Sequence, residues 1–203
     1  MTTVPATIQN LKKAFKIIQK GSLIVYPTDT VYGLGCNPFN KKAVKKIFKV
    51  KDRKYTEALP VLVSSLKEAH RLAYFPKIAD KIVDTFWPGP ITVILKREDT
   101  APNFLGGNPR LIGLRMPDHS LTLKLTDLCG GTLIGTSANR SGIKPARSAA
   151  EAEKQLGKNV ELILDGGRAP SEKSSTIINL SQEKLKILRT GPITKNQLPK
   201  LTN

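Results

Sequence analysis

Apolar residues recur along the chain with two different spacings, and each spacing predicts a different element. In residues 7–20 they return every three or four positions, which is the period of a helix with one buried face. Thr7 is a suitable N-cap for this helix, and Gly21 is suited to end it. The next segment, SLIVY at 22–26, is a short continuous apolar run that is typical of a buried strand.

The same two spacings continue to the end of the chain. Further helices are predicted after Asn40, Ser65 and Pro76, and from Ser148 to about Gly157. Strands are predicted at 59–64, 91–96, 111–115 and 132–137, and then in VELILDGG, STIINL and KLKILR. Residues 120–128 fit either element, because their leucines alternate as in a strand while the glycine at 130 would suit the end of a helix.

Helices and strands are mixed throughout, and no low-complexity linker divides the chain. We therefore expect an α/β fold in one domain spanning residues 1–203, with a core at about 8–191 and a short tail at 192–203. Several late strands follow one another without a helix between them, which predicts a mixed sheet rather than a purely parallel one.

Composition narrows the class of protein. Apolar residues make up 39% and charged residues 24%, which is typical of a folded globular chain. Two cysteines (Cys36, Cys129) and two histidines (His70, His119) are too few and too scattered for a His/Cys metal centre or a disulfide scaffold. No window is apolar enough to span a bilayer, and the first residues lack a signal-peptide core. We expect a cytoplasmic protein that does not contact membranes.

The charge balance points to anionic partners. The chain has 33 Lys and Arg residues against 16 Asp and Glu residues, a net charge of +17. A surplus of this size attracts the phosphates of nucleotides, RNA or DNA. It is also compatible with a lysine-rich solvated surface, and the sign of the charge alone does not choose between these alternatives.

Polar clusters stand at the ends of several predicted strands: PTDTVYG after SLIVY, RMP after LIGL, TSANRSG after TLIG, DGG after ELIL and RTG after KIL. In α/β folds the loops at strand ends converge on ligands, so these clusters predict one shared site. The sequence has no GxxxxGK[ST], no GxGxxG and no GxSxG. We therefore expect a site that binds and positions small polar ligands without a covalent nucleophile.

The motifs YPTDTVYGLGCN, KVKDR, FWPGPITVIL, LRMP, TSANRSG and STIINL, in this order, resemble the YrdC/TsaC family of threonylcarbamoyl-AMP synthases. The resemblance runs from about residue 8 to residue 191. It implies a single YrdC-like domain: a twisted mixed sheet flanked by helices, with a basic concave ligand cavity. The chain is similar to the single-domain members of the family.

The resemblance also implies a reaction. These enzymes are nucleotidyltransferases that convert L-threonine, bicarbonate and ATP into L-threonylcarbamoyladenylate and pyrophosphate. The product serves the synthesis of N6-threonylcarbamoyladenosine at tRNA position 37. Mg²⁺ would accompany ATP, held through its phosphates without protein metal ligands. Further expected partners are tRNA or the downstream threonylcarbamoyl transferase complex, and no organic cofactor is expected.

Site residues follow from the matched motif positions. The resemblance assigns threonine binding to Thr30, Arg115, Ser137 and Ser175. It assigns ATP binding to Lys51, Arg53, Glu57, Asn139, Arg147 and Arg189. Lys51, Arg53, Ser137 and Asn139 together form the family's catalytic signature. The chain departs from the family at Lys54, where members usually carry proline, so the path of residues 54–58 is open.

A different class of function is the alternative. A module of the same fold could bind RNA in the same basic hollow without synthase activity. The net charge of +17 favours this alternative, whereas an aromatic content of only 5%, with no stacking ladder, speaks against it. A carbamoyl-transfer module of the kind found in hydrogenase maturation proteins normally belongs to a much larger chain with zinc-finger-like cysteines.

Overall fold

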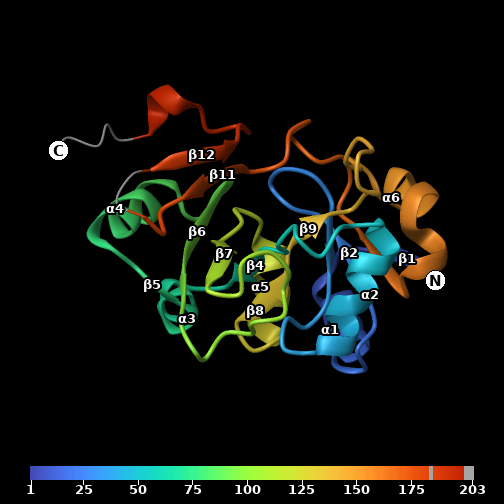
Figure 1. The fold of residues 1–203 in the computed structure, drawn as a ribbon. Helices are drawn as coiled ribbons and strands as arrows, with labels where there is room; N and C mark the ends of the chain where they lie inside the picture. The colour runs from blue at the N-terminus through green and yellow to red at the C-terminus, as the bar shows by residue number, and fades with distance from the viewer. Residues whose placement is uncertain (183–184, 199–203) are drawn as a thin grey trace.

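The computed structural model describes residues 1–182 and 185–198, which form two mixed β-sheets with helices packed around them (Figure 1). The first sheet has five strands in the order β1-β10-β2-β3-β9. The second has the order β12-β11-β6-β7-β4-β8, and β5 pairs with β6 beside this path. The predicted α/β class and mixed strand directions are therefore confirmed, with two sheets where the sequence suggested one.

The strands of the first sheet are β1 (Thr2–Pro5), β2 (Ile24–Tyr26), β3 (Gly33–Gly35), β9 (Thr136–Ser137) and β10 (Leu162–Asp165). Those of the second are β4 (Val61–Val63), β5 (Ala73–Tyr74), β6 (Ile91–Arg97), β7 (Leu111–Arg115), β8 (Thr132–Ile134), β11 (Thr176–Asn179) and β12 (Lys186–Arg189). The α-helices are α1 (Ile8–Gln19), α2 (Lys41–Lys51), α3 (Leu66–Leu72), α4 (Lys77–Phe86), α5 (Ser120–Leu128) and α6 (Ala149–Leu156). Two short 3-10 helices, Gly157–Asn159 and Lys195–Gln197, complete the described elements.

The predicted helix starts are set by local side-chain caps. Thr7, Asn40, Ser65 and Ser148 each accept a hydrogen bond from a backbone N–H in the first turn of α1, α2, α3 and α6. Such caps satisfy N–H groups that have no partner within the helix, which is why they can be recognised from a few neighbouring residues.

The ambiguous segment 120–128 is the helix α5, capped by the ring nitrogen of His119, which accepts from the backbone N–H of Thr122 at 3.3 Å. Helix α5 packs against α1, and Leu125 on its inner side is fully buried. A partner helix therefore decided between the two spacings that the leucines allowed.

The segment 132–137 was predicted as one strand and is divided between the two sheets. Its first part, β8, pairs antiparallel with β4 in the second sheet, and its last part, β9, pairs with β3 in the first. Gly135 lies between them and donates its N–H to the carbonyl of Pro60 at 2.9 Å. β1, β3 and β5 have no local signal in the sequence, because each is only two to four residues long. β1 pairs with the distant strand β10, and β3 pairs with β9 as well as with its neighbour β2.

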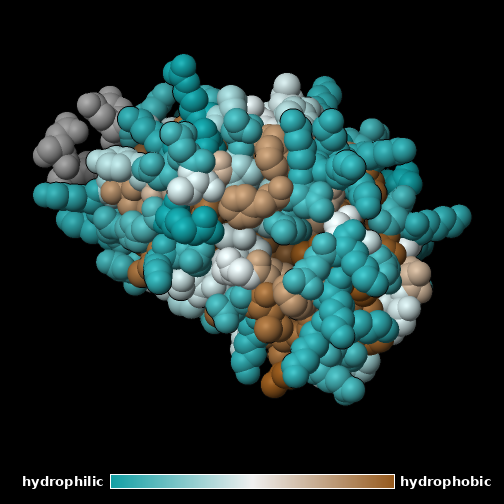
Figure 2. All heavy atoms as spheres, turned by 90° about the horizontal axis from the view of Figure 1, so that it is seen from below, coloured by the Kyte–Doolittle hydropathy of each residue, from teal (hydrophilic) through white to brown (hydrophobic). Residues whose placement is uncertain are grey.

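The core consists of two clusters of buried side chains on either side of this junction. The smaller lies between α1, α5 and the first sheet, and includes Leu11, Ile18 and Leu162. The larger joins both sheets to α2, α3, α4 and α6, and includes Ile47, Val93 and Ile163. None of the described helices is long and apolar enough to cross a membrane. Seen from below, the surface is mostly hydrophilic, and apolar residues show through at several places between the hydrophilic side chains (Figure 2).

Tyr26 joins the sheets through its ring and its hydroxyl. The side chain is fully buried, and its hydroxyl donates to the carbonyl of Ile134 at 2.6 Å. The ring lies against β3, where a Cβ on Gly33 or Gly35 would come within 2.7 or 2.8 Å of its carbon atoms. On Gly35 that Cβ would also lie 2.4 Å from the carbonyl oxygen of Ile134. The two glycines of GLG are therefore required by the close approach of the ring.

Replacing Gly35 with alanine should destabilise the protein by roughly 2–3 kcal/mol, because the added methyl group meets backbone that has no room to move. Urea unfolding at equilibrium would measure the change in the free energy of unfolding. Gly113→Ala is the matched control: it is also a strand glycine, but its Cβ would have its nearest neighbour at 3.5 Å. The control should change stability by less than about 1 kcal/mol. Equal effects of the two substitutions would contradict this account of β3.

Candidate functional site

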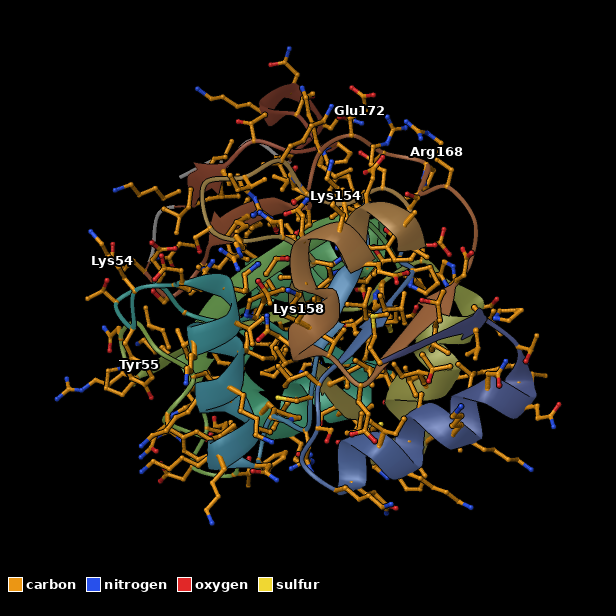
Figure 3. The ribbon with its side chains drawn as sticks, turned by 90° about the vertical axis from the view of Figure 1, so that its right-hand side faces the viewer. Lys54, Tyr55, Lys154, Lys158, Arg168 and Glu172 are labelled. Atoms are coloured by element: carbon orange, nitrogen blue, oxygen red, sulfur yellow. The ribbon has the colours of Figure 1, made fainter. Side chains whose placement is uncertain are left out.

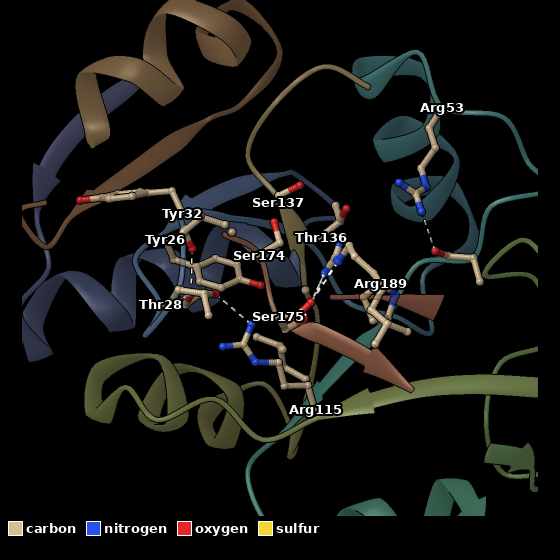
Figure 4. A pocket seen from close by; sticks show the side chains of 18 residues that line it. Tyr26, Thr28, Tyr32, Arg53, Arg115, Thr136, Ser137, Ser174, Ser175 and Arg189 are labelled. Atoms are coloured by element: carbon tan, nitrogen blue, oxygen red, sulfur yellow. Dashed lines mark hydrogen bonds between the residues drawn. The ribbon is translucent and has the colours of Figure 1, made fainter. Parts of the chain in front are cut away.

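A pocket lies where the two sheets meet, and both sheets supply its walls (Figure 4). The first sheet contributes Tyr26, Thr136 and Ser137, and the loop after β2 adds hydroxyls at Thr28 and Thr30. The second sheet contributes four side chains at strand ends or inside strands: Leu62, Arg115, Ile177 and Arg189. Strand ends that are far apart in sequence therefore converge, and four of the five predicted polar clusters supply lining residues; the DGG cluster at 165–167 does not line the pocket.

Arg115 ends β7 and is held on three sides. Its Nη2 lies 2.5 Å from the Asp29 carboxylate, its Nη1 donates to the Thr30 hydroxyl at 3.1 Å, and its Nε donates to the carbonyl of Gly89 at 3.1 Å. Only 7% of the residue is exposed. A guanidinium has five N–H groups, so two of them have no acceptor among the described residues. Fixed N–H groups of this kind suit a carboxylate.

The loop that carries Thr30 is folded on its own hydroxyls. The Thr28 hydroxyl accepts from the Thr30 backbone N–H at 3.1 Å, lies 3.0 Å from the Thr30 hydroxyl and donates to the carbonyl of Val31 at 2.7 Å. Tyr32 continues the wall and donates its hydroxyl to the carbonyl of Gly167 at 2.6 Å. Burial raises the pKa of Tyr32 to about 12, so this hydroxyl remains a proton donor at neutral pH. The small polar residues of PTDTVYG therefore order one side of the pocket.

Arg189 and Ser175 form a second polar group on the other sheet. Arg189 donates from Nε and Nη2 to the carbonyl of Ser175, at 3.0 and 2.8 Å, and from Nη2 to its hydroxyl at 3.2 Å. The Ser175 hydroxyl also lies 2.8 Å from the buried hydroxyl of Thr92. Burial, with the charges of Arg115 and Arg53, lowers the pKa of Arg189 to about 10. The pocket therefore has a positive charge that is only partly compensated.

Arg53 lies at the far side of the pocket from Arg115 (Figure 4). Its guanidinium donates to the carbonyls of Glu57 and Ala58, at 3.1 and 3.0 Å, and pairs with the Glu57 carboxylate at 3.4 Å. Burial lowers the pKa of Arg53, and the charge of Glu57 opposes that effect. Residues 54–58 thus fold back onto Arg53, with Lys54 at the position where the family resemblance led us to expect proline. Lys54 itself lies exposed on the outer edge (Figure 3).

Lys51 is buried, with 1% of its surface exposed, and does not line the pocket directly. Its Nζ donates to the carbonyl of Ser137 at 2.5 Å, to the carbonyl of Asn139 at 2.7 Å and to the Asn139 side-chain oxygen at 3.3 Å. Burial lowers the pKa of Lys51 to about 7, and the carbonyl oxygens around it favour the ammonium form. The amide of Asn139 also donates to the carbonyls of Arg140 and Ile143, at 2.8 and 2.6 Å. Lys51 and Asn139 therefore hold the TSAN loop in place.

Arg147 lies outside this pocket among the described residues. It forms an ion pair with Glu172, and its backbone carbonyl accepts from the Ala169 N–H at 2.7 Å. Figure 3 shows Glu172 near the outer edge of the segment that follows β10. The same segment supplies Ser174 and Ser175 to the pocket, so Arg147 positions a pocket wall in this structure.

Six of the residues predicted for the site line one pocket: Thr30, Arg53, Arg115, Ser137, Ser175 and Arg189. Three more contact this lining without belonging to it: Lys51 and Asn139 bond to the Ser137 carbonyl, and Glu57 pairs with Arg53. Arg147 contacts none of the six and pairs with Glu172. Their roles toward ligands remain predictions. Tyr32 and Thr136 also line the pocket, and Thr92 lies behind Ser175; the motifs did not point to any of the three. Thr92 does not line the pocket: it lies near the start of the apolar strand β6 and contacts the Ser175 hydroxyl from behind.

The chemistry that these groups can supply is recognition of anions and hydroxyls. Three arginines, several hydroxyls and fixed backbone groups face one space, which suits a carboxylate together with phosphates. Among residues 1–182 and 185–198 no three His, Cys, Asp or Glu residues are grouped as a metal site. The arginines and hydroxyls of the pocket can orient ligands and neutralise their negative charge.

Known proteins are similar to this chain in both sequence and fold. The threonylcarbamoyl-AMP synthase of Pyrococcus abyssi is 35% identical over 94% of this chain and 56% of its own length. That of Vibrio parahaemolyticus is 32% identical over 91% of this chain and 100% of its own length. The crystal structure of P. abyssi Sua5 complexed with L-threonine matches with a TM-score of 0.88 at 32% identity, covering 94% of this chain and 56% of that one.

The chain thus spans about half the length of the first of these relatives, 56%. The expectation that it works as a single-domain protein stays a prediction. A family model described as "Telomere recombination", covering Sua5, YciO and YrdC, matches residues 16–191. These residues contain both sheets apart from β1, and every side chain that forms the pocket. The chain belongs to the Sua5/YciO/YrdC family.

Proposed function

We propose that this chain is a threonylcarbamoyl-AMP synthase, a nucleotidyltransferase that forms L-threonylcarbamoyladenylate and pyrophosphate from L-threonine, bicarbonate and ATP. The observation that carries the proposal is a pocket with Arg115, which has N–H groups suited to a carboxylate, on one side and further arginines, Arg53 and Arg189, on the other. The names of the relatives and the L-threonine in the Sua5 crystal structure support the same activity.

The amino acid would bind at the side formed by β7 and the loop after β2. The two remaining N–H groups of Arg115 would receive the threonine carboxylate as a pair of charge-assisted hydrogen bonds. The hydroxyls of Thr30, Ser137 and Ser175 lie around the same pocket and could bind the amine or the hydroxyl of threonine.

The nucleotide would bind at the side formed by Arg53 and Arg189. Arg53 has a partly exposed partner, and Arg189 bonds only to neutral groups of Ser175, so both keep charge for phosphate oxygens. Glu57, Asn139 and Arg147 belong to the proposed ATP side through the motif positions they match. Mg²⁺ would accompany the triphosphate and offset part of its negative charge.

The reaction needs positioning more than it needs a nucleophilic side chain. The threonine amine attacks the bicarbonate carbon with loss of water and leaves a carbamate. A carbamate oxygen then attacks the α-phosphorus of ATP, and pyrophosphate departs with the electrons of the broken P–O bond. Fixed cations that hold the carboxylate of threonine, the bicarbonate and the triphosphate together lower the barrier through proximity and electrostatic stabilisation.

The product would pass to a threonylcarbamoyl transferase that modifies tRNA position 37, with tRNA or that enzyme complex as the partner in the cytoplasm. The alternative of an RNA-binding module without synthase activity is less well supported. The pocket is lined by fixed arginines and hydroxyls, with Tyr26 and Tyr32 as its aromatic residues. Tyr26 is fully buried between the sheets, so it is not free to stack on a base.

Purified protein should release pyrophosphate only when ATP, L-threonine and bicarbonate are all present. A coupled pyrophosphate assay with each substrate omitted in turn would measure this. Lys51→Ala should abolish most of the release, because it removes the ammonium that holds the TSAN loop. Lys49→Ala, an exposed lysine on the same helix, is the matched control and should retain activity. Release that is independent of threonine would rule out the synthase.

Single substitutions on the two sides of the pocket should affect threonine binding and ATP binding separately. Arg115→Ala should weaken threonine binding by about tenfold or more while changing ATP binding little, because it removes a charge-assisted carboxylate site. Arg53→Ala should have the opposite effect. Titration calorimetry with each ligand alone would measure both affinities. If both variants lost both ligands equally, this division of the pocket would be wrong.

The buried ammonium of Lys51 should make stability depend on pH. Burial lowers the pKa of the folded lysine to about 7, whereas an unfolded lysine titrates at about 10.4. Between these values the unfolded chain binds a proton that the folded chain does not, so wild-type stability rises with pH. Relative to Lys51→Met, the wild type should therefore gain unfolding free energy from about pH 7 to about pH 10. Urea unfolding across this range would measure it, and parallel pH profiles would contradict it.

A further inference from the structure

The three arginines of the pocket differ in how completely their charge is compensated. Arg115 pairs with Asp29 at 2.5 Å, and both side chains are nearly buried, at 8% and 12% exposure. Arg53 pairs with Glu57 at 3.4 Å, and that carboxylate is 51% exposed, where water screens it. Arg189 bonds to Ser175 and to no carboxylate among the described residues. The pocket is therefore close to neutral on the Arg115 side and positive on the other.

Asp29 does not face the pocket itself. It is absent from the lining, and it reaches Arg115 from behind, next to Thr30 in the same loop. One of its oxygens accepts from Arg115, while the other, Oδ2, is buried without a hydrogen-bond partner among the described residues. A buried carboxylate oxygen without a donor costs stability. A carboxylate that is kept beside a ligand pocket at a cost in stability indicates that its negative charge has a function there.

We propose that Asp29 is a specificity-determining residue, which keeps Arg115 available to the carboxylate of a zwitterionic amino acid and excludes phosphates from it. The inference rests on the proposed function, because it takes the Arg115 side as the amino-acid side. Asp29 acts through Arg115 and touches no ligand, so its effect is electrostatic selection within one pocket.

The physical reason lies in the charges of the ligands. An α-amino acid carries one carboxylate and one ammonium and has no net charge, so the Asp29 carboxylate repels its anionic end and attracts its cationic end. Pyrophosphate and the triphosphate of ATP carry several negative charges and no positive one, so Asp29 only repels them. In a partly buried pocket this repulsion is weakly screened by salt. Phosphates are thus directed to Arg53 and Arg189.

Selection is needed because the positive groups adjoin one another. Arg189 shares the pocket with both Arg53 and Arg115, and lies between them in Figure 4. The charges of both neighbours act on Arg189, in agreement with its place between them. Without Asp29, a triphosphate or the departing pyrophosphate would meet a continuous row of three cations and could occupy the amino-acid side.

The test compares pyrophosphate binding to the wild type and to Asp29→Asn by titration calorimetry, without turnover. Asparagine keeps the size and one acceptor oxygen but removes the charge. The variant should bind pyrophosphate about tenfold more tightly or better. The gain should disappear in the double variant Asp29→Asn, Arg115→Ala. The matched control is Asp99→Asn, which removes the charge from an exposed pair with Arg97 and should leave pyrophosphate binding unchanged.

The proposal fails if Asp29→Asn leaves pyrophosphate affinity unchanged, or if Asp99→Asn raises it equally. If Asp29→Asn does not fold, the wild type provides a second test. Threonine titrated into the wild type in the presence of saturating pyrophosphate should bind with the same affinity as in its absence. Displacement of threonine by pyrophosphate would overturn the proposal. Failure of the wild type to bind threonine would count against the proposed function, whereas the pyrophosphate titrations of the variants would still decide the role of Asp29.

Discussion

Residues 132–137 take part in both sheets, and the remaining architecture of the site depends on this crossing. β8 belongs to the second sheet and β9 to the first, and only Gly135 lies between them. A Cβ on Gly135 would come within 2.5 Å of the Leu62 side chain, so the crossing needs a residue without one. The hydroxyl of Tyr26 anchors the same segment through the carbonyl of Ile134. The junction thereby places the TSAN loop at the meeting point of the two sheets.

The electrostatic character of the site follows from that geometry. A carbonyl or a hydroxyl holds each of the pocket arginines in one orientation, and the ammonium of Lys51 is directed at the carbonyls of the TSAN loop. Side chains fixed in this way lose little freedom when a ligand arrives, and Arg189, which bonds to neutral acceptors, keeps most of its attraction for anions. This preorganisation would allow the proposed reaction, which needs no nucleophilic side chain, to bring a carboxylate, a carbamate and a triphosphate together.

Local features of the fold were accessible from the sequence, and long-range features were not. Thr7, Asn40, Ser65 and Ser148 act within three residues of themselves, so the helix starts that they set could be predicted. β1 and β3 are defined by partners more than a hundred residues away or by glycines that pack against a tyrosine ring, which no local pattern records. Arg115, Arg53 and Ser175 were predicted because the order of motifs matched a family, whereas Tyr32 joins the pocket lining and Thr92 supports Ser175 only through packing.

By itself the sequence determined the periodic elements, the basic charge and the identity of the motif residues, because these depend on neighbours in the chain. The tertiary structure alone decided which motif residues face one another: the division of 132–137 between sheets, the pairing of Asp29 with Arg115 across 86 residues, and the burial of Lys51 behind the pocket. These outcomes depend on the packing of two sheets against each other. A hydrogen bond or an ion pair between distant segments forms only when that packing excludes water and brings the partners into reach.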